Sequence, residues 1–545
     1  MKNKKNSKIW LILSSISALT AMLPLAAISC DHKVKQNSKE NKEDLKPDEN
    51  KPNPKPEGEN LGTTPEDKPE NPAKEDDSSN LNKKFKFELT KSNTWKIAKF
   101  IGNDSKVTIP GKYQGKNITE IGNRAFFHSV IQSITIAGSV KEIGESAFSG
   151  CKNIKEVILN EGLEKIGAEA FQDTNIKSIT IPGSVKEIGE SAFSWCENLK
   201  EVSLNEGLEK IGNQAFYQTK IESITIPGSV KEIGAEAFKY TNIKSITIPR
   251  SIKEIGKGAF SDCKNLKEVS LNEGLEKIGA EAFLNTNIES ISIPGSVKEI
   301  GARAFSWCTN LKEIILNKGL EEIGAGAFAG TDIKSITIPG SVKEIGADAF
   351  WNTNIKSITI PGSVKEIGER AFSGCENLKE VILNKGLEKI GARAFYDTKI
   401  EFITIPGSVK EIGESAFSGC KNLKEVILNK GLEKIGTGAF YDTKIESITI
   451  PGSVKEIGER AFSGCENLKE VILNKGLEKI GARAFYDTKI EFITIPGSVK
   501  EIGESAFFGC WNLKKVIYKG DASNINRWLN IGIDKTKIKI ISSNN

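Results

Sequence analysis

Histidine is nearly missing from this chain of 545 residues, which contains only His32 and His128. Histidine is the usual general base and the commonest metal ligand near neutral pH. No Ser-His-Asp set, Cys-His set or zinc-ligand spacing can be assembled from the remaining residues. The sequence therefore predicts no enzyme, no cofactor and no metal site.

An excess of charge is missing as well. Residues 1–29 carry Lys2, Lys4, Lys5 and Lys8 and no acidic residue. Without them, 76 − 4 = 72 basic residues face 71 acidic ones, which leaves a net charge of +1. Because a nucleic-acid binder needs a strongly basic footprint, we expect no nucleic-acid partner. The many Lys and Glu residues are interpreted as an interspersed, solvated surface.

Long helical patterns are the third absence, and a short repeat takes their place. The motif IG-x-x-AF occurs eighteen times, and successive motif Phe residues are 22 or 23 positions apart. No part of the repeat shows ten or more residues of helical periodicity. A fixed period of this size predicts a solenoid, in which each coil buries its apolar side against its neighbours.

One coil shows how the chain is expected to run. Ile224 and Ile226 alternate with Thr225, which predicts a short strand with Ile inward and Thr outward. Pro227 ends the strand because it has no N–H to donate to a ladder. Phe238 is expected to fill the widest part of the coil. The same strand in successive coils should stack in parallel.

The pattern IxxIxIPxxVxxIGxxAFxxC resembles the bacterial leucine-rich repeat of the BspA surface-protein type, over about residues 118–513. This resemblance implies a curved, β-rich solenoid of about eighteen coils, with a parallel sheet on the concave face and little regular helix. It also implies surface exposure and, in several members, attachment to host matrix proteins or to other cells.

The two ends of the chain depart from the repeat. Residues 1–29 are first basic and then apolar, which predicts a secretory signal. Their end, LAAIS followed by Cys30, resembles a bacterial lipobox and implies a lipid on Cys30; an ordinary signal peptide or an uncleaved anchor are the alternatives. The charged, Pro-rich residues 30–84 predict a disordered tether. Residues 85–117 predict an N-terminal β cap, and residues 514–545 a C-terminal cap.

Eight cysteines follow the repeat, each three residues after a motif Phe, where most other coils have Thr. No two adjacent coils both carry Cys, so the nearest pair is roughly 9–10 Å apart. A disulfide needs Cα atoms within about 7 Å of each other. We therefore predict reduced, buried thiols that act as small apolar fillers. These residues are Cys151, Cys196, Cys263, Cys308, Cys375, Cys420, Cys465 and Cys510.

The residues expected to face outward from the strands are the candidates for binding. Thr is common at one outward position, but five coils have Ile there: Ile158, Ile315, Ile382, Ile427 and Ile472. At another outward position, Phe402 and Phe492 replace Ser. An apolar stripe flanked by Lys and Glu predicts a protein-binding surface, although scattered exposed Ile residues are normal on a sheet. Trp195, Trp307 and Trp351 lie near turns at the other edge, where they serve either packing or recognition.

Two functional hypotheses follow. The first is a monomeric, lipid-anchored protein on the extracellular face of the membrane, which binds a protein of the host or of a neighbouring cell. The second is a structural or antigenically variable coat protein without a dedicated ligand. Residues 357–417 are identical to residues 447–507, which indicates recent tandem copying and predicts a repeat number that varies between strains.

Overall fold

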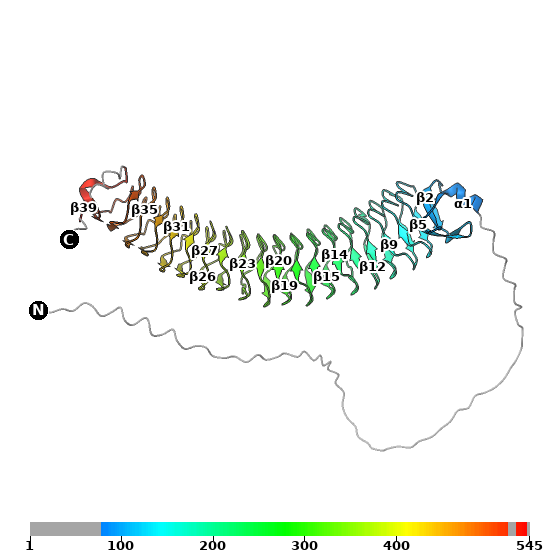
Figure 1. The fold of residues 1–545 in the computed structure, drawn as a ribbon, viewed down its shortest axis with the longest axis horizontal. Helices are drawn as coiled ribbons and strands as arrows, with labels where there is room; N and C mark the ends of the chain where they lie inside the picture. Colours follow the sequence, from blue (N-terminus) through cyan, green and yellow to red (C-terminus); the bar gives the residue numbers. More distant parts are fainter. Residues whose placement is uncertain (1–77, 522–529, 542–545) are drawn as a thin grey trace, which may run out of the picture. The chain divides into compact units, whose positions relative to one another are not determined.

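The computed structural model describes residues 78–521 and 530–541 (Figure 1). The predicted signal segment 1–29, Cys30 and most of the predicted tether lie outside the described residues. Inside them, no helix has both the length and the apolar character needed to cross a membrane.

The repeat forms a β-solenoid of about 19 turns of about 23 residues each, and Figure 1 shows the coils stacked in a row that curves into an arc. Most coils contribute a four-residue strand, a turn at Pro-Gly or Lys-Gly, a two-residue strand and then the turn that carries the motif Phe. Apart from one short helix at each end, no helix occurs in the described ranges. The predicted β-rich leucine-rich repeat fold is confirmed.

The two-residue strands form an unbroken parallel ladder, which belongs to a 21-stranded sheet that also includes β1, β2, β4 and β5 of the N-terminal end. Each strand is the Glu-Ile or Lys-Ile that precedes the motif Gly, and its Ile is buried. These strands are β7 (Glu142–Ile143), β9 (Lys165–Ile166), β11 (Glu187–Ile188), β13 (Lys210–Ile211), β14 (Glu232–Ile233), β16 (Glu254–Ile255), β18 (Lys277–Ile278), β20 (Glu299–Ile300), β22 (Glu322–Ile323), β23 (Glu344–Ile345), β25 (Glu366–Ile367), β27 (Lys389–Ile390), β29 (Glu411–Ile412), β31 (Lys434–Ile435), β33 (Glu456–Ile457), β35 (Lys479–Ile480) and β37 (Glu501–Ile502).

The longer strands form several separate parallel sheets. Three, β3–β6–β8, pair near the N-terminal end, four sheets contain two strands each, and seven strands from β28 to β39 pair at the C-terminal end. The strands are β3 (Lys106–Ile109), β6 (Ser133–Ile136), β8 (Glu156–Leu159), β10 (Ser178–Ile181), β12 (Glu201–Leu204), β15 (Ser245–Ile248), β17 (Glu268–Leu271), β19 (Ser290–Ile293), β21 (Glu313–Leu316), β24 (Ser357–Ile360), β26 (Glu380–Leu383), β28 (Phe402–Ile405), β30 (Glu425–Leu428), β32 (Ser447–Ile450), β34 (Glu470–Leu473), β36 (Phe492–Pro496), β38 (Lys515–Lys519) and β39 (Ile538–Ile540).

In Figure 1 the two-residue strands β14, β20 and β27 lie nearer the inner side of the arc than the longer strands β15, β19 and β26. The continuous parallel sheet is therefore built from the Glu-Ile and Lys-Ile pairs. The longer strands, such as Ser-Ile-Thr-Ile, form the interrupted side.

A single extra residue decides which longer strands pair. The segment that connects the Phe turn to the next longer strand, here called the return, begins at the Cys or Thr position. After a Cys, as in Cys196-Glu-Asn-Leu199, this return is one residue longer than after a Thr, as in Thr174-Asn-Ile176. Strands that lie 23 residues apart are hydrogen-bonded along their whole length, for example Ser178 with Glu201. Strands that lie 22 apart share at most three residue pairs. The Cys and Thr positions therefore mark how each coil is joined to the coil before it.

A ladder of stacked Phe rings runs through the core. Each motif Phe stacks on the next, with centroids 4.7–5.6 Å apart. The motif phenylalanines are Phe126, Phe148, Phe171, Phe193, Phe216, Phe238, Phe260, Phe283, Phe305, Phe328, Phe350, Phe372, Phe395, Phe417, Phe440, Phe462, Phe485 and Phe507, all buried. Rings at this separation pack as offset stacks and bury a large apolar area.

Backbone hydrogen bonds connect the turn that carries the motif Phe to the same turn of the next coil. Alternate amides donate to the next coil, as Arg483 N does to Glu504 O and Phe485 N to Ala506 O. The residue two before each Phe has a positive φ, for example +54° at Arg483. L-residues seldom adopt this left-handed backbone, so the ladder imposes this conformation in coil after coil.

Residues 85–117, the predicted N-terminal β cap, contain a hairpin and an irregular first coil. Strands β1 (Phe85–Leu89) and β2 (Trp95–Phe100) pair antiparallel, and β2 pairs in parallel with β5 (Lys116–Ile121). β4 (Lys112–Tyr113) folds back on β5. Phe100 stacks on Phe126 at 4.9 Å and so begins the Phe ladder one coil before the repeat motif does.

The predicted disordered tether, residues 30–84, is wrong at its end, because Ser78–Lys84 form helix α1. Leu81 packs against the apolar core, and Tyr113 donates its hydroxyl hydrogen to Asn82 Oδ1 at 2.8 Å. The amide of Ile101 donates to Lys84 O at 2.8 Å. These contacts offset the ordering entropy that composition alone suggested the segment could not overcome.

The C-terminal end continues the backbone ladder after the repeat stops. Ser505 N donates to Asn530 O, and Phe507 N donates to Ile531 O, whose side chain is buried. β39 pairs in parallel with β38, after the short 3-10 helix Lys535–Lys537. Residues 530–540 thereby supply the backbone hydrogen-bond acceptors and the neighbouring strand that a further repeat would otherwise provide to the last coil.

The eight repeat cysteines are all buried and free. Cys196 donates its S–H to Phe171 O at 3.1 Å and lies 3.1 Å from the Thr174 hydroxyl of the preceding coil. Burial raises the pKa of the Cys196 thiol to about 11, which keeps it protonated. The prediction that these thiols act as buried fillers is confirmed.

Candidate binding surface

All seven residues of the predicted apolar stripe are exposed on the outer face of the longer strands. Each strand alternates buried and exposed residues, as a half-buried strand requires. Phe402 and Phe492 are the most exposed pair of phenylalanines, at 53% and 57% of their surface. The five isoleucines, Ile158, Ile315, Ile382, Ile427 and Ile472, are also exposed.

The structure brings only some of these residues together. In the seven-stranded sheet, Glu470 of β34 pairs with Phe492 of β36, and Ile472 pairs with Thr494, so Ile472 and Phe492 are diagonal neighbours. With Ile517 of β38 they line a shallow hollow of about 450 Å³. Strand pairing likewise places Phe402 diagonally to Ile427. We call Phe402, Ile427, Ile472, Phe492 and Ile517 the strand-face patch.

Of the other predicted positions, Ile158 lies apart from this patch, in the three-stranded sheet near the N-terminal end, and a single exposed apolar residue is normal on a protein surface. Ile315 and Ile382 belong to two other small sheets but line one hollow of about 520 Å³. Ile382 of β26 also lies one coil before Phe402 of β28, as Ile472 lies one coil before Phe492, and β26 contacts β28. Ile382 therefore adjoins the strand-face patch, although β26 and β28 are not paired in one sheet.

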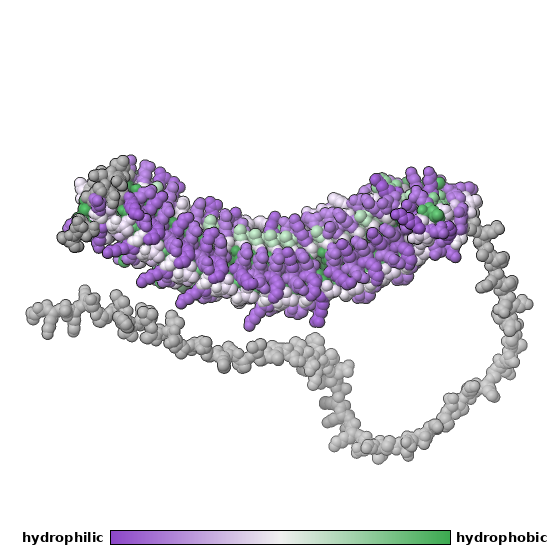
Figure 2. All heavy atoms as spheres, viewed as in Figure 1, coloured by the Kyte–Doolittle hydropathy of each residue, from purple (hydrophilic) through white to green (hydrophobic). Residues whose placement is uncertain are grey.

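Charged side chains surround the strand-face patch in pairs that link neighbouring coils. Lys514 Nζ is 2.7 Å from Glu491 Oε2 and 5.6 Å from the centroid of the Phe492 ring. Lys379 and Glu401 approach each other in the same way at 3.9 Å. Exposed pairs of this kind stabilise a fold only slightly. They form a polar rim around the apolar residues, and Figure 2 shows hydrophilic residues over most of the visible face.

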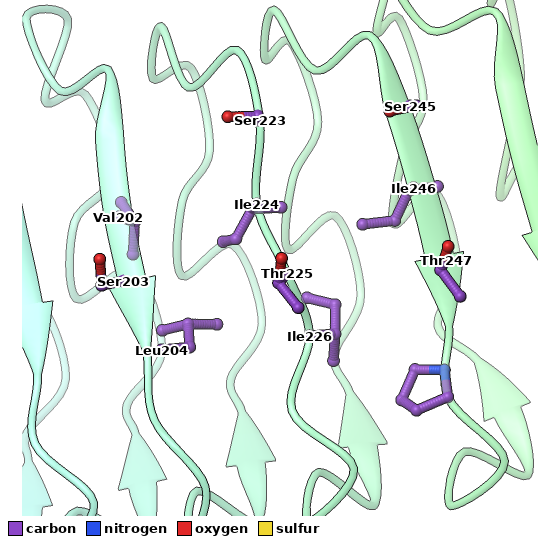
Figure 3. Close-up of a pocket in the computed structure, with 11 residues that line it drawn as sticks. Val202, Ser203, Leu204, Ser223, Ile224, Thr225, Ile226, Ser245, Ile246 and Thr247 are labelled. Atoms are coloured by element: carbon purple, nitrogen blue, oxygen red, sulfur yellow. The ribbon is translucent and has the colours of Figure 1, made fainter. Parts of the chain in front are cut away.

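The interrupted side of the solenoid also contains open hollows. Segment Ser223–Ile226 has the strand pattern but shares only a single bridge, Glu201 with Ser223. A hollow of about 530 Å³ extends from β12 across this segment to β15, and Figure 3 shows Ser203, Thr225 and Thr247 on three successive coils along it. This coil follows one Thr return and precedes another, so neither neighbour lies 23 residues away. The regular parallel pairing that the sequence predicts for Ile224–Ile226 is therefore wrong for this coil.

The His and Cys side chains of the described ranges lie away from these surfaces or are buried. In the part of the chain that the structure describes, no group of three or more His, Cys, Asp or Glu residues could hold a metal ion. His128 lies against the neighbouring coil, with Nδ1 3.3 Å from Gly150 O. The repeat cysteines have raised pKa values because they are buried, which opposes thiolate chemistry.

The tryptophans near the turns belong to a second exposed surface, on the side of the Phe turn. Trp195 and Trp307 are exposed, and Trp307 lies edge-to-face with Trp351 at 6.0 Å. From the sequence, Trp195, Trp307 and Trp351 are expected to serve either packing or recognition, and the nearby tyrosines are not among the candidates. The signal for the tyrosines is the residue directly after the motif Phe, which alternates between Ser and an aromatic residue from Trp351 to Tyr486.

Comparison with known proteins agrees with this geometry. A profile of the BspA type leucine rich repeat region, with six copies, matches residues 119–241, 231–356, 343–456 and 433–545. No curated protein matches the chain.

Solved structures of similar proteins come from several bacteria. A leucine-rich repeat protein from Bacteroides ovatus is 28% identical with a TM-score of 0.49, over 84% of this chain and 98% of that one. A leucine rich cell surface protein from Faecalibacterium prausnitzii is 26% identical with a TM-score of 0.30, over 83% and 97%. The pneumococcal vaccine antigen PcpA is 21% identical with a TM-score of 0.28, over 84% and 91%. The chain resembles bacterial cell-surface proteins with leucine-rich repeats.

Proposed function

Because the chain belongs to the BspA-type leucine-rich repeat family, we propose that it is a membrane-anchored surface lipoprotein whose solenoid binds proteins of the host matrix or of neighbouring cells. Cys30 would carry the lipid, and residues 31–77 would separate the solenoid from the membrane. The protein would act as a monomer that binds its partner and catalyses no reaction.

The strand-face patch is the observation that supports protein binding. Large apolar side chains lie at the outward positions of the seven-stranded sheet, where sister strands carry Ser447 or Ser357 instead of Phe. Burial of an exposed Phe against a partner contributes about 1.5–3 kcal/mol. A small apolar centre within a rim of paired charges has the anatomy of a protein interface.

The binding test uses residues 73–545, which form a compact unit of their own, against immobilised matrix proteins. The double substitution Phe402→Ser and Phe492→Ser copies residues that sister coils already contain, so the fold should be retained. We expect affinity to fall by about 2–4 kcal/mol, roughly 30- to 1000-fold. The matched control is Thr449→Ser, on the same sheet face. Unchanged affinity in the double variant would refute the strand-face patch as the binding site, and absence of binding to any matrix protein would refute the adhesive function.

The membrane anchor needs a separate experiment. Cells that express the full chain are fed a labelled fatty acid and treated with an impermeant surface reagent. Label on the wild-type chain and none on Cys30→Ala would support lipidation. An equally labelled variant, or a chain that the surface reagent cannot reach, would contradict the proposed anchor or its orientation.

A coat protein without a dedicated ligand is the second candidate. It is favoured by the identity of residues 357–417 with residues 447–507, which extends to outward positions. Copying of this kind supplies length and variability directly. Sequencing the locus in several isolates tests it, because one fixed length would contradict this candidate.

A further inference from the structure

The surface on the side of the Phe turn has a regular pattern in the C-terminal half of the solenoid. The residue after the motif Phe alternates between an exposed Tyr, as at Tyr396 and Tyr441, and a buried Ser, as at Ser418 and Ser463. Successive Phe rings beneath are 5.3 and 5.4 Å apart, so neighbouring tyrosines are roughly 11 Å apart. A tyrosine therefore lies on every second coil, and the coil between two tyrosines has a buried serine at that position.

A hollow of about 640 Å³ lies between Tyr441 and Tyr486. Besides the two tyrosines, it is lined by Ser415, Ser418, Ser463 and Thr437, by Arg460 and Arg483, and by Glu414 and Gly438. The lining contains no aliphatic side chain larger than a methyl group. It therefore combines two aromatic walls with a floor of hydroxyl groups.

The polar groups of this hollow are not used within the protein. The hydroxyl groups of Ser415, Ser418 and Ser463 form no side-chain hydrogen bond in the described ranges, although Ser418 and Ser463 are only 6% and 4% exposed. Arg483 forms neither a side-chain hydrogen bond nor an ion pair there. Arg460 has only its sequence neighbour Glu459, at 3.7 Å. None of these hydroxyl oxygens is among the buried side-chain atoms without a partner in the described ranges, so they reach the open hollow and can form hydrogen bonds to a polar ligand.

We propose that this hollow binds sugar rings of an acidic glycan, with a sugar carboxylate on Arg483. The flat faces of Tyr441 and Tyr486 can cover the C–H faces of a pyranose ring. Serine and threonine hydroxyls and the carboxylate of Glu414 exchange hydrogen bonds with ring hydroxyls. The guanidinium of Arg483 matches a carboxylate with two parallel hydrogen bonds. The spacing of the tyrosines is of the order of one extended disaccharide, so a polymer of disaccharide units can keep the same register.

Other ligand classes fit this hollow less well. A peptide anchored by an apolar side chain would find no aliphatic pocket here. A nucleic acid would bring phosphates toward Glu414, the half-buried Asp442 and the exposed Asp487 without a basic stripe to offset the repulsion. The mixture of hydroxyls, planar polar groups and aromatic faces is what a polyhydroxylated ring uses.

The aromatic surface extends beyond a single sugar. Tyr486 stacks on Phe508 at 5.6 Å with an angle of 18°, and Phe508 contacts Trp511 at 6.1 Å. Trp511 is 80% exposed. A related slot lies 90 residues earlier, where Trp351 stands in place of Tyr441 and Arg393 is the counterpart of Arg483. In that slot Arg370, the counterpart of Arg460, is bound by Asp348 at 3.2 Å and lies over the Trp351 ring.

The experiment measures binding of a hyaluronan decasaccharide, which alternates an acidic and a neutral sugar, to the full chain in detergent. A cellulose oligosaccharide of equal length is the neutral comparison, and polyglutamate is the polyanion comparison. Tyr486→Ser and Arg483→Ser copy Ser463 and Ser415 of sister coils, so both variants should fold. We expect each to weaken hyaluronan binding about tenfold, while Tyr486→Phe retains it.

Two controls separate this site from the strand-face patch. Phe402→Ser should leave hyaluronan binding unchanged, and Tyr486→Ser should leave binding to matrix proteins unchanged. No binding of hyaluronan, or equal binding by Tyr486→Ser, would overturn the proposal. Equal affinity for the cellulose oligosaccharide would overturn the carboxylate on Arg483, and equal affinity for polyglutamate would reduce the interaction to general electrostatics and overturn the site.

Discussion

Three glycines of the same solenoid should respond differently to the same substitution, Gly→Ala. At Gly413 the backbone of the preceding coil is so close that an added Cβ would lie 2.7 Å from Ala392 N and 2.8 Å from Ile390 O. At Gly438 an added Cβ would lie 3.3 Å from Ser415 Oγ, a tight contact that a small shift of the Ser415 side chain relieves, and φ is +59°. At Gly340 no atom lies within 4 Å and φ is ordinary.

The magnitudes follow from these environments. Gly413→Ala forces two coils apart at the continuous ladder, and overpacking of this kind costs about 3 kcal/mol. Gly438→Ala retains the ladder but places an L-residue in the left-handed region, which costs about 1 kcal/mol. Sister coils hold Ser415 and Arg460 at the same position, so this coil should still form. Gly340→Ala removes backbone freedom from the unfolded chain alone and should stabilise by about 0.5 kcal/mol.

The assay is the midpoint of guanidinium unfolding of residues 73–545, followed by far-UV circular dichroism. Because neighbouring coils rather than the whole chain set the stability of a solenoid, amide hydrogen exchange around each substituted coil measures the local effect. Exchange should accelerate most near Gly413 and least near Gly340. Equal midpoints and equal exchange for Gly413→Ala and Gly340→Ala would refute the argument that close approach of the coils requires the motif glycine.

Further outcomes can be predicted from the core and from the C-terminal end. Burial raises the pKa of six repeat thiols, Cys196 among them, from 9.0 to about 11. Between pH 9 and pH 11 the thiols of the unfolded chain therefore lose protons that those of the folded chain keep. The free energy of unfolding should fall as the pH rises from 9 to 11, and the contribution of the thiols should be fully present below pH 9. A denaturation series over that range checks it, and constant stability would contradict buried thiols. Phe417→Ala removes one ring from the ladder and should cost about 3–5 kcal/mol, again measured by local hydrogen exchange. Ile531→Asp places a charge in the C-terminal end and should expose the last coil first, so that limited proteolysis begins there; unchanged protease resistance would argue against its role.

The repeating part of the fold could be predicted because its signals are local and occur eighteen times. The period, the inward Ile residues and the buried cysteines such as Cys196 follow from alternation and spacing. The pairing of the longer strands could not be predicted, since it depends on one residue in the return after Cys or Thr. That residue changes no apolar position, so hydrophobic periodicity does not reveal it.

The non-repeating parts were less predictable. Composition favoured a tether up to Lys84, but contacts of Leu81 and Asn82 with residues that are distant in sequence order the helix α1. Of the strand-face patch, the sequence supplied the outward positions of Phe402 and Phe492, whereas strand register decided which isoleucines join them. The hollow beside Tyr486 escaped sequence reasoning because single aromatic residues on a turn carry no signal until the stacking of coils aligns them.

The unequal joining of the coils gives the solenoid two mechanically different edges. Along the Phe turns every coil is hydrogen-bonded to the next, whereas within the repeat the longer strands pair along their whole length where the spacing is 23 and only partly where it is 22. A stretching force applied to the two ends of the solenoid should therefore separate the longer strands first, where they are only partly paired, while the hydrogen bonds along the Phe turns remain intact. Duplication of a Cys and Thr coil pair should lengthen the solenoid without reducing its resistance to bending. Insertion of a single Thr coil, as at Ser223–Ile226, adds a coil whose longer strand is fully paired with neither neighbour.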